Sequence, residues 1–287
     1  MACITLMTDF GNRDDSAGCC RGVIVGRAPN ARLVDITHEI PPFDVRRGAL
    51  TWINVLPYMP VGIHVGVVDP GVGTARRPIA VRTRRGDVLV GPDNGLLPAA
   101  AAVLGGVSEA VALAEERFML QPRSNTFHGR DIFAPMAAAL ATGTPLGDLG
   151  PALDPATLIT LDLPRPRWDG EALHCAVVYV DNFGNVRLNA GDDVVSRWGL
   201  YEGDDVVSRW GLHEGDVVGV TLGGHSLSVP FARSFGMVPE GAAALIVDAY
   251  WHLMLAINRG HAAATYGVGI DAPVVLRRTG DGAKDAE

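Results

Sequence analysis

Short apolar runs alternate with helical stretches through the first half of the chain, and this alternation constrains the fold more than any other feature. Strands leave a period of two and helices a period near 3.6 in the spacing of apolar residues. Repeated alternation of the two is typical of a layered α/β domain with a largely parallel sheet. We predict strands at 3–8, 32–36, 63–68, 79–82 and 87–90, and helices at 14–27, 45–56, 96–104 and 130–142.

The second half of the chain has a different pattern. A Pro-rich, aperiodic stretch at 158–170, which ends in LDLPRPRWDG, is typical of a linker. After it come short β-like runs, separated by Gly-rich turns, at 175–180, 186–188, 217–221, 226–229, 244–247 and 253–257. These runs favour a small antiparallel barrel or sandwich. The predicted organisation is an N-terminal α/β/α domain (1–157), a linker (158–170) and a C-terminal β-domain (171–287).

Composition narrows the classes of protein that the chain can belong to. With 287 residues, 48% of them hydrophobic and 20% charged, the chain has the material for a globular core. A formal net charge of −8 argues against a nucleic-acid-binding surface, which needs a basic stripe. The N-terminus lacks the features of a signal peptide, and no apolar run approaches the ~20 residues of a membrane span. We expect a cytoplasmic protein with a small-molecule partner and without nucleic-acid or membrane partners.

Two further features are interpreted as chemically inert. The four cysteines, Cys3, Cys19, Cys20 and Cys175, match neither a disulfide framework nor a CxxC metal motif, so we expect reduced thiols. The segment DDVVSRWGLYEG at 192–203 recurs at 204–215 as DDVVSRWGLHEG. A local tandem duplication in a surface loop explains this repeat, because loop-closure entropy grows only slowly with length.

Polar residues follow several of the predicted strands. Asp9 comes directly after the first strand, Asp69 follows the strand at 63–68, and GPDNG at 91–95 follows another. In open α/β sheets, ligands bind at the carboxyl ends of strands, so these residues are expected to converge on a site. The alternative is that each aspartate only caps a helix or stabilises a turn.

The segment DPGVGTAR at 69–76 resembles a phosphate-binding loop only superficially. It lacks the Gly-Lys-Ser/Thr ending, and it begins with a carboxylate that would repel phosphate. We interpret it as a tight Gly-rich turn that brings Arg76 back to Asp69. A carboxylate–guanidinium pair would then orient both groups.

Two more motifs have the residue types of a binding site. TFHGRDIFAP (126–135) places His128 at a predicted helix start, between Phe127 and Gly129, where the glycine allows close approach by a ligand. In DNFGNVRLN (181–189), Asn185 can hydrogen-bond an adenine edge, and Phe183 can stack on the base. The alternatives are a structural histidine and an ordinary hairpin turn.

Taken together, these motifs resemble the S-adenosylmethionine hydroxide adenosyltransferases, which are relatives of the fluorinase and chlorinase. The resemblance is carried, in order, by TDFGNRDDS, DITHEIPPFDVRRGA, VVDPGVGTARR, GPDNG, TFHGRDIFAP, DNFGNVRLN and the C-terminal AINRGHAAA. It implies an N-terminal α/β/α domain, a C-terminal antiparallel β-barrel and a homotrimer with active sites between subunits. It also implies hydrolysis of S-adenosyl-L-methionine to adenosine and L-methionine, without a metal or another cofactor.

The resemblance further implies a role for individual residues. Asp69, Arg76 and His128 would form the catalytic triad, with His128 accepting a proton from water, Arg76 stabilising hydroxide and Asp69 holding the arrangement. The substrate-binding residues would be Asp9 and Phe43 at the ribose; Asp14, Ser16, Asp181 and Tyr250 at the methionine; Asn185, Asn258, Phe183 and Phe235 at the adenine; and Phe127 and Gly129 beside His128. Around Tyr250 the chain departs from the family pattern, with Ala249 before it and Trp251 after it.

Two other functions remain open from the residues themselves. A metal-dependent nucleotidase could use Asp9, Asp14, Asp93 and His128 as ligands for a hard cation. A sensor could bind adenosine or S-adenosylmethionine without turnover. Chromatography of the products after incubation with S-adenosylmethionine separates these alternatives from the hydrolase.

Overall fold

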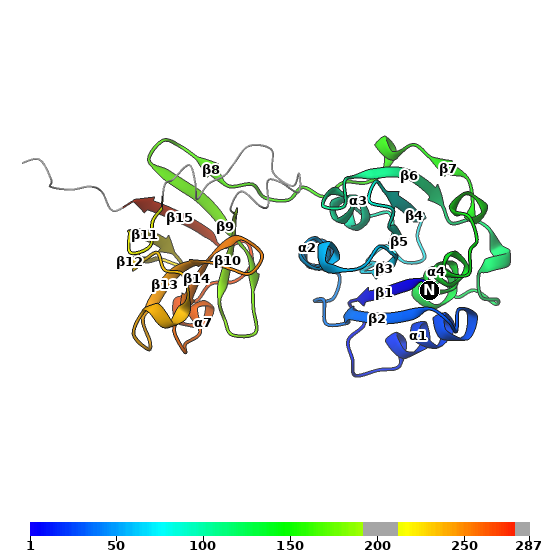
Figure 1. The fold of residues 1–287 in the computed structure, drawn as a ribbon, viewed down its shortest axis with the longest axis horizontal. Helices are drawn as coiled ribbons and strands as arrows, with labels where there is room; N and C mark the ends of the chain where they lie inside the picture. Colours follow the sequence, from blue (N-terminus) through cyan, green and yellow to red (C-terminus); the bar gives the residue numbers. More distant parts are fainter. Residues whose placement is uncertain (192–211, 279–287) are drawn as a thin grey trace, which may run out of the picture. The chain divides into compact units, whose positions relative to one another are not determined.

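The structure is a computed structural model that describes residues 1–191 and 212–278. Two compact units make up the chain, Met1–Asp162 and Leu163–Glu287 (Figure 1). Most of the tandem repeat at 192–215 lies outside the described residues, so its placement in a surface loop stays a prediction.

The first unit is built on a seven-stranded sheet with the order β2-β1-β3-β5-β4-β6-β7. Its strands are β1 (Cys3–Thr8), β2 (Arg32–Thr37), β3 (Ile63–Val67), β4 (Pro78–Thr83), β5 (Val88–Pro92), β6 (Val107–Ala112) and β7 (Ala152–Leu153). Its helices are α1 (Ser16–Arg27), α2 (Val45–Val55), α3 (Leu96–Ala102) and α4 (Ala134–Ala141), with a π-helical turn, η3 (Gly129–Phe133), directly before α4. Short 3-10 turns are η1 (Leu56–Tyr58), η2 (Glu116–Phe118), η4 (Leu146–Leu149) and η5 (Pro155–Thr157).

Strand direction in this sheet is mixed, with most strands parallel. The neighbours β2, β1, β3 and β5 all run in the same direction, whereas β4 is antiparallel to both β5 and β6. The reversal follows from chain length, because only residues 84–87 connect β4 to β5 and a parallel crossover needs a dozen or more residues. The predicted α/β class is confirmed, and β6 and β7 are strands that the sequence pattern did not reveal.

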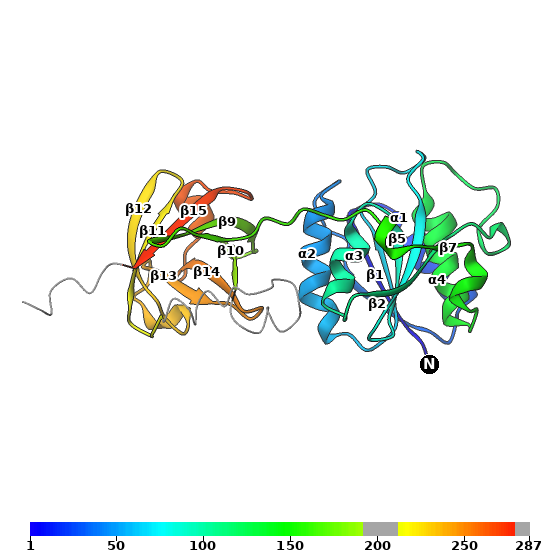
Figure 2. The ribbon, with the colours of Figure 1, turned by 90° about the horizontal axis from the view of Figure 1, so that it is seen from above.

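Alternating side chains of the strands bury both faces of the sheet. On one face, Ile4 and Leu6 pack in a cluster with Ile24 of α1 and Phe133, next to α4. On the other face, Met7 packs with Trp52 of α2 and with residues of α3. Figure 2 shows α2 and α3 on one side of the sheet and α4 on the other. Because both faces are covered, the edge at which the strands end is the part of the sheet left for a ligand.

The second unit is an antiparallel, nearly closed barrel. Its described strands are β8 (Arg167–Trp168), β9 (Ala172–Val180), β10 (Val186–Gly191), β11 (Val217–Leu222), β12 (His225–Pro230), β13 (Ala243–Val247), β14 (His252–Ile257) and β15 (Pro273–Arg278), with α7 (Ala262–Tyr266) and η6 (Phe235–Met237). The order is β12-β11-β15-β9-β10-β14-β13, and β8 pairs with β9. A bridge between Phe231, just after β12, and Leu245 of β13 links the two ends of this order. The barrel, rather than an open sandwich, is therefore the architecture of this unit.

The stretch between the two units contributes to both. Leu158 is buried in the core of the first unit, and Leu161 lies against Gly95. Further along, Arg167 and Trp168 pair with β9 in the second unit. The Pro-rich composition at 158–170 thus marks the passage from one unit to the other, although several of its residues are packed.

A buried ionic network lies at the amino-terminal edge of the first sheet, before β5. The fully buried Asp87 carboxylate accepts hydrogen bonds from Arg85 at 2.7 and 2.9 Å and from Thr83 at 3.1 Å, and it lies 3.1 Å from His64 Nε2. The His64 ring in turn lies 2.9 Å from the Thr5 hydroxyl. Burial alone would raise the pKa of Asp87, but the hydrogen bonds from His64 and Arg85 outweigh it and hold this pKa well below its ordinary value.

We expect Asp87→Asn to lower the free energy of unfolding by about 1–3 kcal/mol, because the buried His64 and the partly exposed Arg85 lose the carboxylate that they bind. The folded pKa of Asp87 lies below the unfolded value of about 3.9, so the carboxylate stabilises the fold fully above that value. This stabilisation is lost as the pH falls through the folded pKa. Urea unfolding at pH 7 and pH 3, followed by circular dichroism, measures the free energy of unfolding. Its decrease from pH 7 to pH 3 should be smaller in the variant than in the parent.

The matched control is Glu109→Gln, which removes the carboxylate of an exposed pair with Arg82. Exposed pairs contribute ~0–1 kcal/mol, so this variant should unfold close to the parent. Equal unfolding midpoints for Asp87→Asn and Glu109→Gln would contradict a structural role for the network.

Candidate active site

The carboxyl ends of β1 and β3 bring Asp9 and Asp69 to the same edge of the sheet. The two strands are parallel neighbours, and the Asp9 N–H donates to the Val67 carbonyl at 3.3 Å. Asp9 Oδ2 accepts a hydrogen bond of 2.9 Å from the N–H of Phe43. Burial raises the pKa of Asp9, and the nearby Asp69 charge adds to this rise, while the Phe43 hydrogen bond opposes it. Asp9 and Asp69 therefore lie together as predicted, whereas Asp93 of GPDNG, which was expected at the same site, does not join them.

Phe43 has an unusual backbone conformation for an aromatic residue. Its φ is +68°, and it is 70% exposed. A positive φ in a bulky residue costs of order 1–3 kcal/mol and persists only where surrounding contacts enforce it. The Asp9 carboxylate is one such contact, so Asp9 and Phe43 are held as a unit.

The turn that follows β3 returns Arg76 to Asp69, as the sequence predicted. Arg76 Nε donates to Asp69 Oδ1 at 3.0 Å, and Arg76 Nη2 donates to Asp69 Oδ2. Both side chains are more than nine-tenths buried. Gly73 makes the turn possible, because its φ is +76° and a side chain there would collide with the backbone at Asn125. The result is a fixed, bidentate ion pair.

His128 completes a three-residue network with this pair. Arg76 Nη2 also donates to His128 Nδ1 at 3.0 Å. The ring is positioned at the start of η3, for which His128 is the N-terminal flanking residue. Burial lowers the pKa of His128, and the Arg76 charge lowers it further, so the ring is neutral at neutral pH. With Nδ1 occupied as an acceptor, the neutral ring carries its proton on Nε2.

A cavity of about 240 Å³ lies at this edge of the sheet. It brings together six of the predicted residues: Asp9, Phe43, Asp69, Phe127, His128 and Gly129. Sequence reasoning missed five other lining residues: Phe10, Pro42, Val67, Val72 and Thr126. The Phe10 and Phe127 rings meet edge to face at 5.8 Å, and a side chain at position 129 would press on Phe10. The position of Phe10 in TDFGN was the available signal.

Asp14 and Ser16 do not line this cavity. They lie at the start of α1, where Asp14 Oδ1 accepts a hydrogen bond of 3.1 Å from the Ser16 N–H. Asp93 is also elsewhere, since its carboxylate binds Arg77 at 2.5 and 2.8 Å and the Ile159 N–H at 3.0 Å. The four ligands of the nucleotidase hypothesis are therefore not assembled. Within residues 1–191 and 212–278, no group of three or more His, Cys, Asp or Glu side chains could hold a metal ion.

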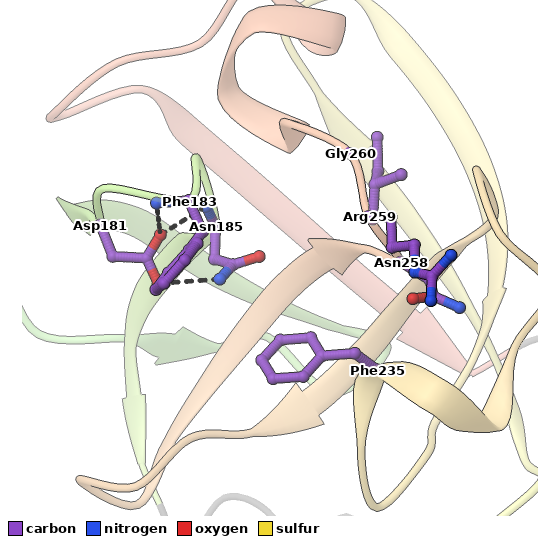
Figure 3. Close-up of a pocket in the computed structure, with 8 residues that line it drawn as sticks. Asp181, Phe183, Asn185, Phe235, Asn258, Arg259 and Gly260 are labelled. Carbon is purple, nitrogen blue, oxygen red and sulfur yellow. Dashed lines mark hydrogen bonds between the residues drawn. The ribbon is translucent and has the colours of Figure 1, made fainter.

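The barrel unit has its own cavity, of about 630 Å³. It is lined by Asp181, Phe183, Asn185, Phe235, Ile257, Asn258, Arg259 and Gly260. Figure 3 shows the 181–185 turn on one side, residues 258–260 on the other and the Phe235 ring between them. The sequence predicted five of these residues, Asp181, Phe183, Asn185, Phe235 and Asn258. It did not predict Ile257, Arg259 and Gly260, which flank Asn258 in AINRG.

Hydrogen bonds within the barrel cavity preorganise its polar groups. The Asp181 carboxylate accepts from the N–H groups of Phe183 and Asn185 at 2.9 Å each, and from Asn185 Nδ2 at 2.8 Å. Asn258 Nδ2 donates to the Val238 carbonyl at 2.8 Å, which leaves its side-chain oxygen as the group available to a ligand. Phe183 is 76% and Phe235 is 42% exposed, so both rings are accessible for stacking.

Tyr250 lines neither cavity. Its ring lies 4.7 Å from the guanidinium of Arg187, which also stacks on Tyr179 at 4.8 Å and pairs with Asp248. The Asp248 carboxylate accepts the Tyr250 N–H at 2.8 Å. Tyr250 is thus fixed in the turn between β13 and β14, and the predicted contact with methionine is not reproduced by the cavity lining.

Comparisons with known proteins agree with this two-unit architecture. Family models for the SAM hydroxide adenosyltransferase N-terminal and C-terminal domains match residues 4–150 and 175–275. An (R)-S-adenosyl-L-methionine hydrolase of Salinispora tropica is 42% identical over 265 residues, which are 92% of this chain and 94% of the relative. A fluorinase of Actinoplanes sp. is 28% identical over 65% of this chain and 70% of its own length.

A solved structure supports the same conclusion. An uncharacterized conserved protein from Thermotoga maritima superimposes with a TM-score of 0.85 at 32% identity, covering 96% of this chain and all of that one. The described part of the chain, residues 1–191 and 212–278, contains no helix long and apolar enough to cross a membrane. In the α/β unit Asp69 and His128 line a cavity and are joined by Arg76, which is not itself among the lining residues. Together with a barrel whose cavity is lined by aromatic rings, this defines a two-domain enzyme that acts on a small molecule. The chain belongs to the SAM hydroxide adenosyltransferase family.

Proposed function

We propose that this enzyme hydrolyses S-adenosyl-L-methionine to adenosine and L-methionine, with the nucleophilic water held by Asp69, Arg76 and His128. The observation that carries this proposal is the hydrogen-bonded network of these three residues beside the same cavity as Asp9. No cofactor enters the proposal. The names of the relatives support the substrate, and the geometry supports the assignment of the residues.

The reaction makes few demands on the leaving group. When the oxygen of water attacks the ribose C5′ carbon, a C–O bond forms and the C5′–S bond breaks, with its electron pair remaining on sulfur. The sulfonium leaves as a neutral thioether, so no acid is needed. One proton of the water stays on the new 5′-hydroxyl, and the other is released to solvent. The protein must therefore orient the nucleophile and stabilise its negative charge.

The triad has the properties that this task requires. Arg76 supplies a fixed positive charge next to the nucleophile, and the bidentate pair with Asp69 prevents its side chain from moving. His128 contacts the nucleophile through the one ring nitrogen that Arg76 does not occupy. Both side chains of the ion pair are largely excluded from solvent, which strengthens their electrostatic effect.

The substrate-binding residues divide between the two units. In the first unit, Asp9 accepts the ribose hydroxyls and Phe43 packs beside the sugar. In the barrel, Asn185 and Asn258 hydrogen-bond the adenine and an exposed aromatic ring covers its face. Asp14, Ser16, Asp181 and Tyr250 remain proposed contacts of the methionine portion. The cytoplasmic location also stays a prediction.

Assembly into a homotrimer, with the sites at subunit interfaces, is part of the proposal. Neither unit holds all the proposed residues, and exposed aromatic side chains line both cavities: Phe43 in the first unit, Phe183 and Phe235 in the barrel. Exposed aromatic clusters are typical of surfaces that a ligand or a partner subunit covers. In a cyclic trimer, the first unit of one subunit would contact the barrel of its neighbour, and each site would be formed by these two subunits.

The decisive experiment is incubation with S-adenosylmethionine in water enriched in oxygen-18, followed by chromatography and mass spectrometry. We expect adenosine with one heavy oxygen and unlabelled L-methionine, with one proton released per turnover. Excess chelator should leave the rate unchanged. Unlabelled adenosine, other products or no turnover would contradict the proposal. Separate incubation with the two sulfonium epimers tests whether this chain, as the name of its Salinispora relative states, acts on the (R) form.

Asp9→Asn should weaken substrate binding more than it slows the chemical step. A carboxylate accepts hydrogen bonds from both ribose hydroxyls, whereas a neutral amide accepts with only one of its two groups, and an unpaired buried hydroxyl costs ~1–3 kcal/mol. We expect KM to rise by about 5–100-fold, with a smaller change in kcat. Steady-state kinetics measure both values. A fall in kcat at constant KM would show that Asp9 acts on the reaction and not on the ribose.

A further inference from the structure

A buried threonine and a buried histidine are paired next to Asp9, the residue assigned to the ribose. Thr8, the last residue of β1, and His38, directly after β2, are 0% and 2% exposed, and Thr8 Oγ1 lies 2.8 Å from His38 Nδ1. The two strands are parallel neighbours, so both residues lie at the carboxyl edge of the sheet. Neither residue lines the cavity, so any effect on a ligand must pass through a neighbouring residue.

The Thr8 hydroxyl connects His38 to the backbone of the cavity wall. The N–H of Phe10, which lines the cavity, donates to Thr8 Oγ1 at 3.2 Å. His38 also holds this turn through its main chain, because its carbonyl accepts the N–H of Gly11 at 2.7 Å. The turn that carries Asp9 and Phe10 is therefore attached to His38 at two points.

The carboxylate on the far side of His38 determines the direction of these hydrogen bonds. His38 Nε2 faces Asp35 Oδ1 at 3.2 Å, although it is not aligned for a hydrogen bond, and Asp35 Oδ2 accepts from Arg21 of α1 at 2.7 Å. A ring nitrogen that faces a carboxylate carries the proton, because a lone pair there would be repelled. In the neutral ring Nδ1 is then the acceptor for the Thr8 hydroxyl hydrogen. The hydroxyl oxygen keeps its lone pairs for the Phe10 N–H.

We propose that His38 is a positioning residue for ribose recognition: it fixes the Thr8 hydroxyl, which in turn fixes the turn that directs the Asp9 carboxylate. The assignment of Asp9 to the ribose hydroxyls belongs to the proposed function, and this inference rests on it. Without His38, the Thr8 hydroxyl rotates freely and no longer favours the Phe10 N–H. A carboxylate that binds two neighbouring hydroxyls must hold both oxygens within hydrogen-bond distance, so a small shift of the turn weakens binding of the ribose.

The same strand carries a second threonine–histidine pair that provides a matched control. Thr5 Oγ1 lies 2.9 Å from His64 Nδ1, and both residues are fully buried. His64 belongs to the ionic network with Asp87 at the opposite edge of the sheet. Thr5→Val and Thr8→Val therefore remove the same hydroxyl from the same strand, but only Thr8→Val acts on the turn after β1.

Ribose recognition is measured by calorimetry as the Kd of 2′,3′-dideoxyadenosine divided by the Kd of adenosine, because these nucleosides differ only in the two hydroxyls. We expect Thr8→Val and His38→Gln to lower this ratio by about 5–50-fold, with little change in dideoxyadenosine affinity. Thr8→Ser keeps the hydroxyl, and His38→Asn has a side-chain oxygen that can replace Nδ1, so both should retain most of the ratio. Thr5→Val should leave it unchanged.

Kinetics and hydrogen exchange separate positioning from a general loss of stability. In Thr8→Val and His38→Gln, KM for S-adenosylmethionine should rise while kcat changes less, and the Phe10 amide should exchange faster with solvent. Thr5→Val should lower the unfolding midpoint without either of these effects. Equal weakening of both nucleosides, or an unchanged ratio in folded Thr8→Val, would overturn the inference.

The same measurements distinguish failure of this inference from failure of the proposed function. A ratio that falls in both variants of a parent without hydrolase activity supports the positioning role and contradicts the proposed function. Hydrolysis by a parent whose ratio responds to neither Thr8→Val nor His38→Gln does the reverse. A parent that binds both nucleosides equally overturns the inference, because the ribose hydroxyls are then not recognised.

Discussion

Arg76→Ala and His128→Ala are each expected to reduce turnover of S-adenosylmethionine by about 10²–10³-fold while leaving adenosine affinity within a few-fold of the parent. Both side chains are assigned to the nucleophile, and neither is assigned to the nucleoside. Losing a preorganised donor removes stabilisation that exists mainly in the transition state, so kcat should fall more than substrate binding. Product chromatography measures turnover, and calorimetry measures adenosine binding.

The two variants differ in their expected effect on stability, and this difference provides a control. Arg76→Ala leaves the buried Asp69 carboxylate without its partner, which should cost about 3–5 kcal/mol of folding free energy. His128→Ala removes a half-buried neutral ring and should cost less. Arg82→Ala, on an exposed pair, should change neither activity nor stability. Parallel loss of turnover and adenosine binding in His128→Ala would show that this residue contacts the nucleoside.

Mixing two inactive chains should restore activity if the sites lie between subunits. His128→Ala disables the first-unit cavity, and Asn185→Ala disables the barrel cavity. In trimers that assemble at random from equal amounts, about a quarter of the interfaces join an intact first unit to an intact barrel. We therefore expect the mixture to recover up to about a quarter of the parent activity after co-refolding, from a background near zero.

Oligomer composition must be measured alongside activity. Differently tagged chains and native mass spectrometry show whether mixed assemblies form. A double variant carrying both substitutions, mixed with either single variant, should recover nothing, because no interface then has two intact halves. Mixed assemblies without recovered activity would place each complete site within one chain and would refute the interfacial proposal.

The class of fold could be predicted from the sequence because its signals are local. The nearly continuous apolar run of β1, which includes Ile4, Leu6 and Met7, is typical of a strand that is covered on both faces. In the structure Ile4 and Leu6 pack on one face and Met7 packs on the other. Strand β6, VSEAVA, escaped prediction because the polar Ser108 and Glu109 are exposed and its apolar residues are small. The position of β5 between β3 and β4 depends on pairing partners, which periodicity does not specify.

The candidate site shows the same division between local and distant information. The Asp69–Arg76 pair spans a single Gly-rich turn, so residue types and spacing were sufficient to predict it. The Asp9–Phe43 hydrogen bond joins residues 34 positions apart, and the Arg76–His128 contact joins residues 52 positions apart. Likewise, Arg259 was not predicted although it directly follows Asn258, because that cavity forms where the 181–185 turn, Phe235 and residues 257–260 come together.

The sequence by itself therefore determined an α/β half and an antiparallel β half, the motifs that carry the chemistry and the pairing of Asp69 with Arg76. Periodicity and turn geometry act over a few residues, and a linear chain displays them directly. Only the tertiary structure decided which motifs share a cavity, that Asp93 serves an ion pair elsewhere, and which nitrogen of His128 is left for a ligand. Those outcomes depend on the direction of individual donors and acceptors across distant segments, which is set by how the strands and helices pack.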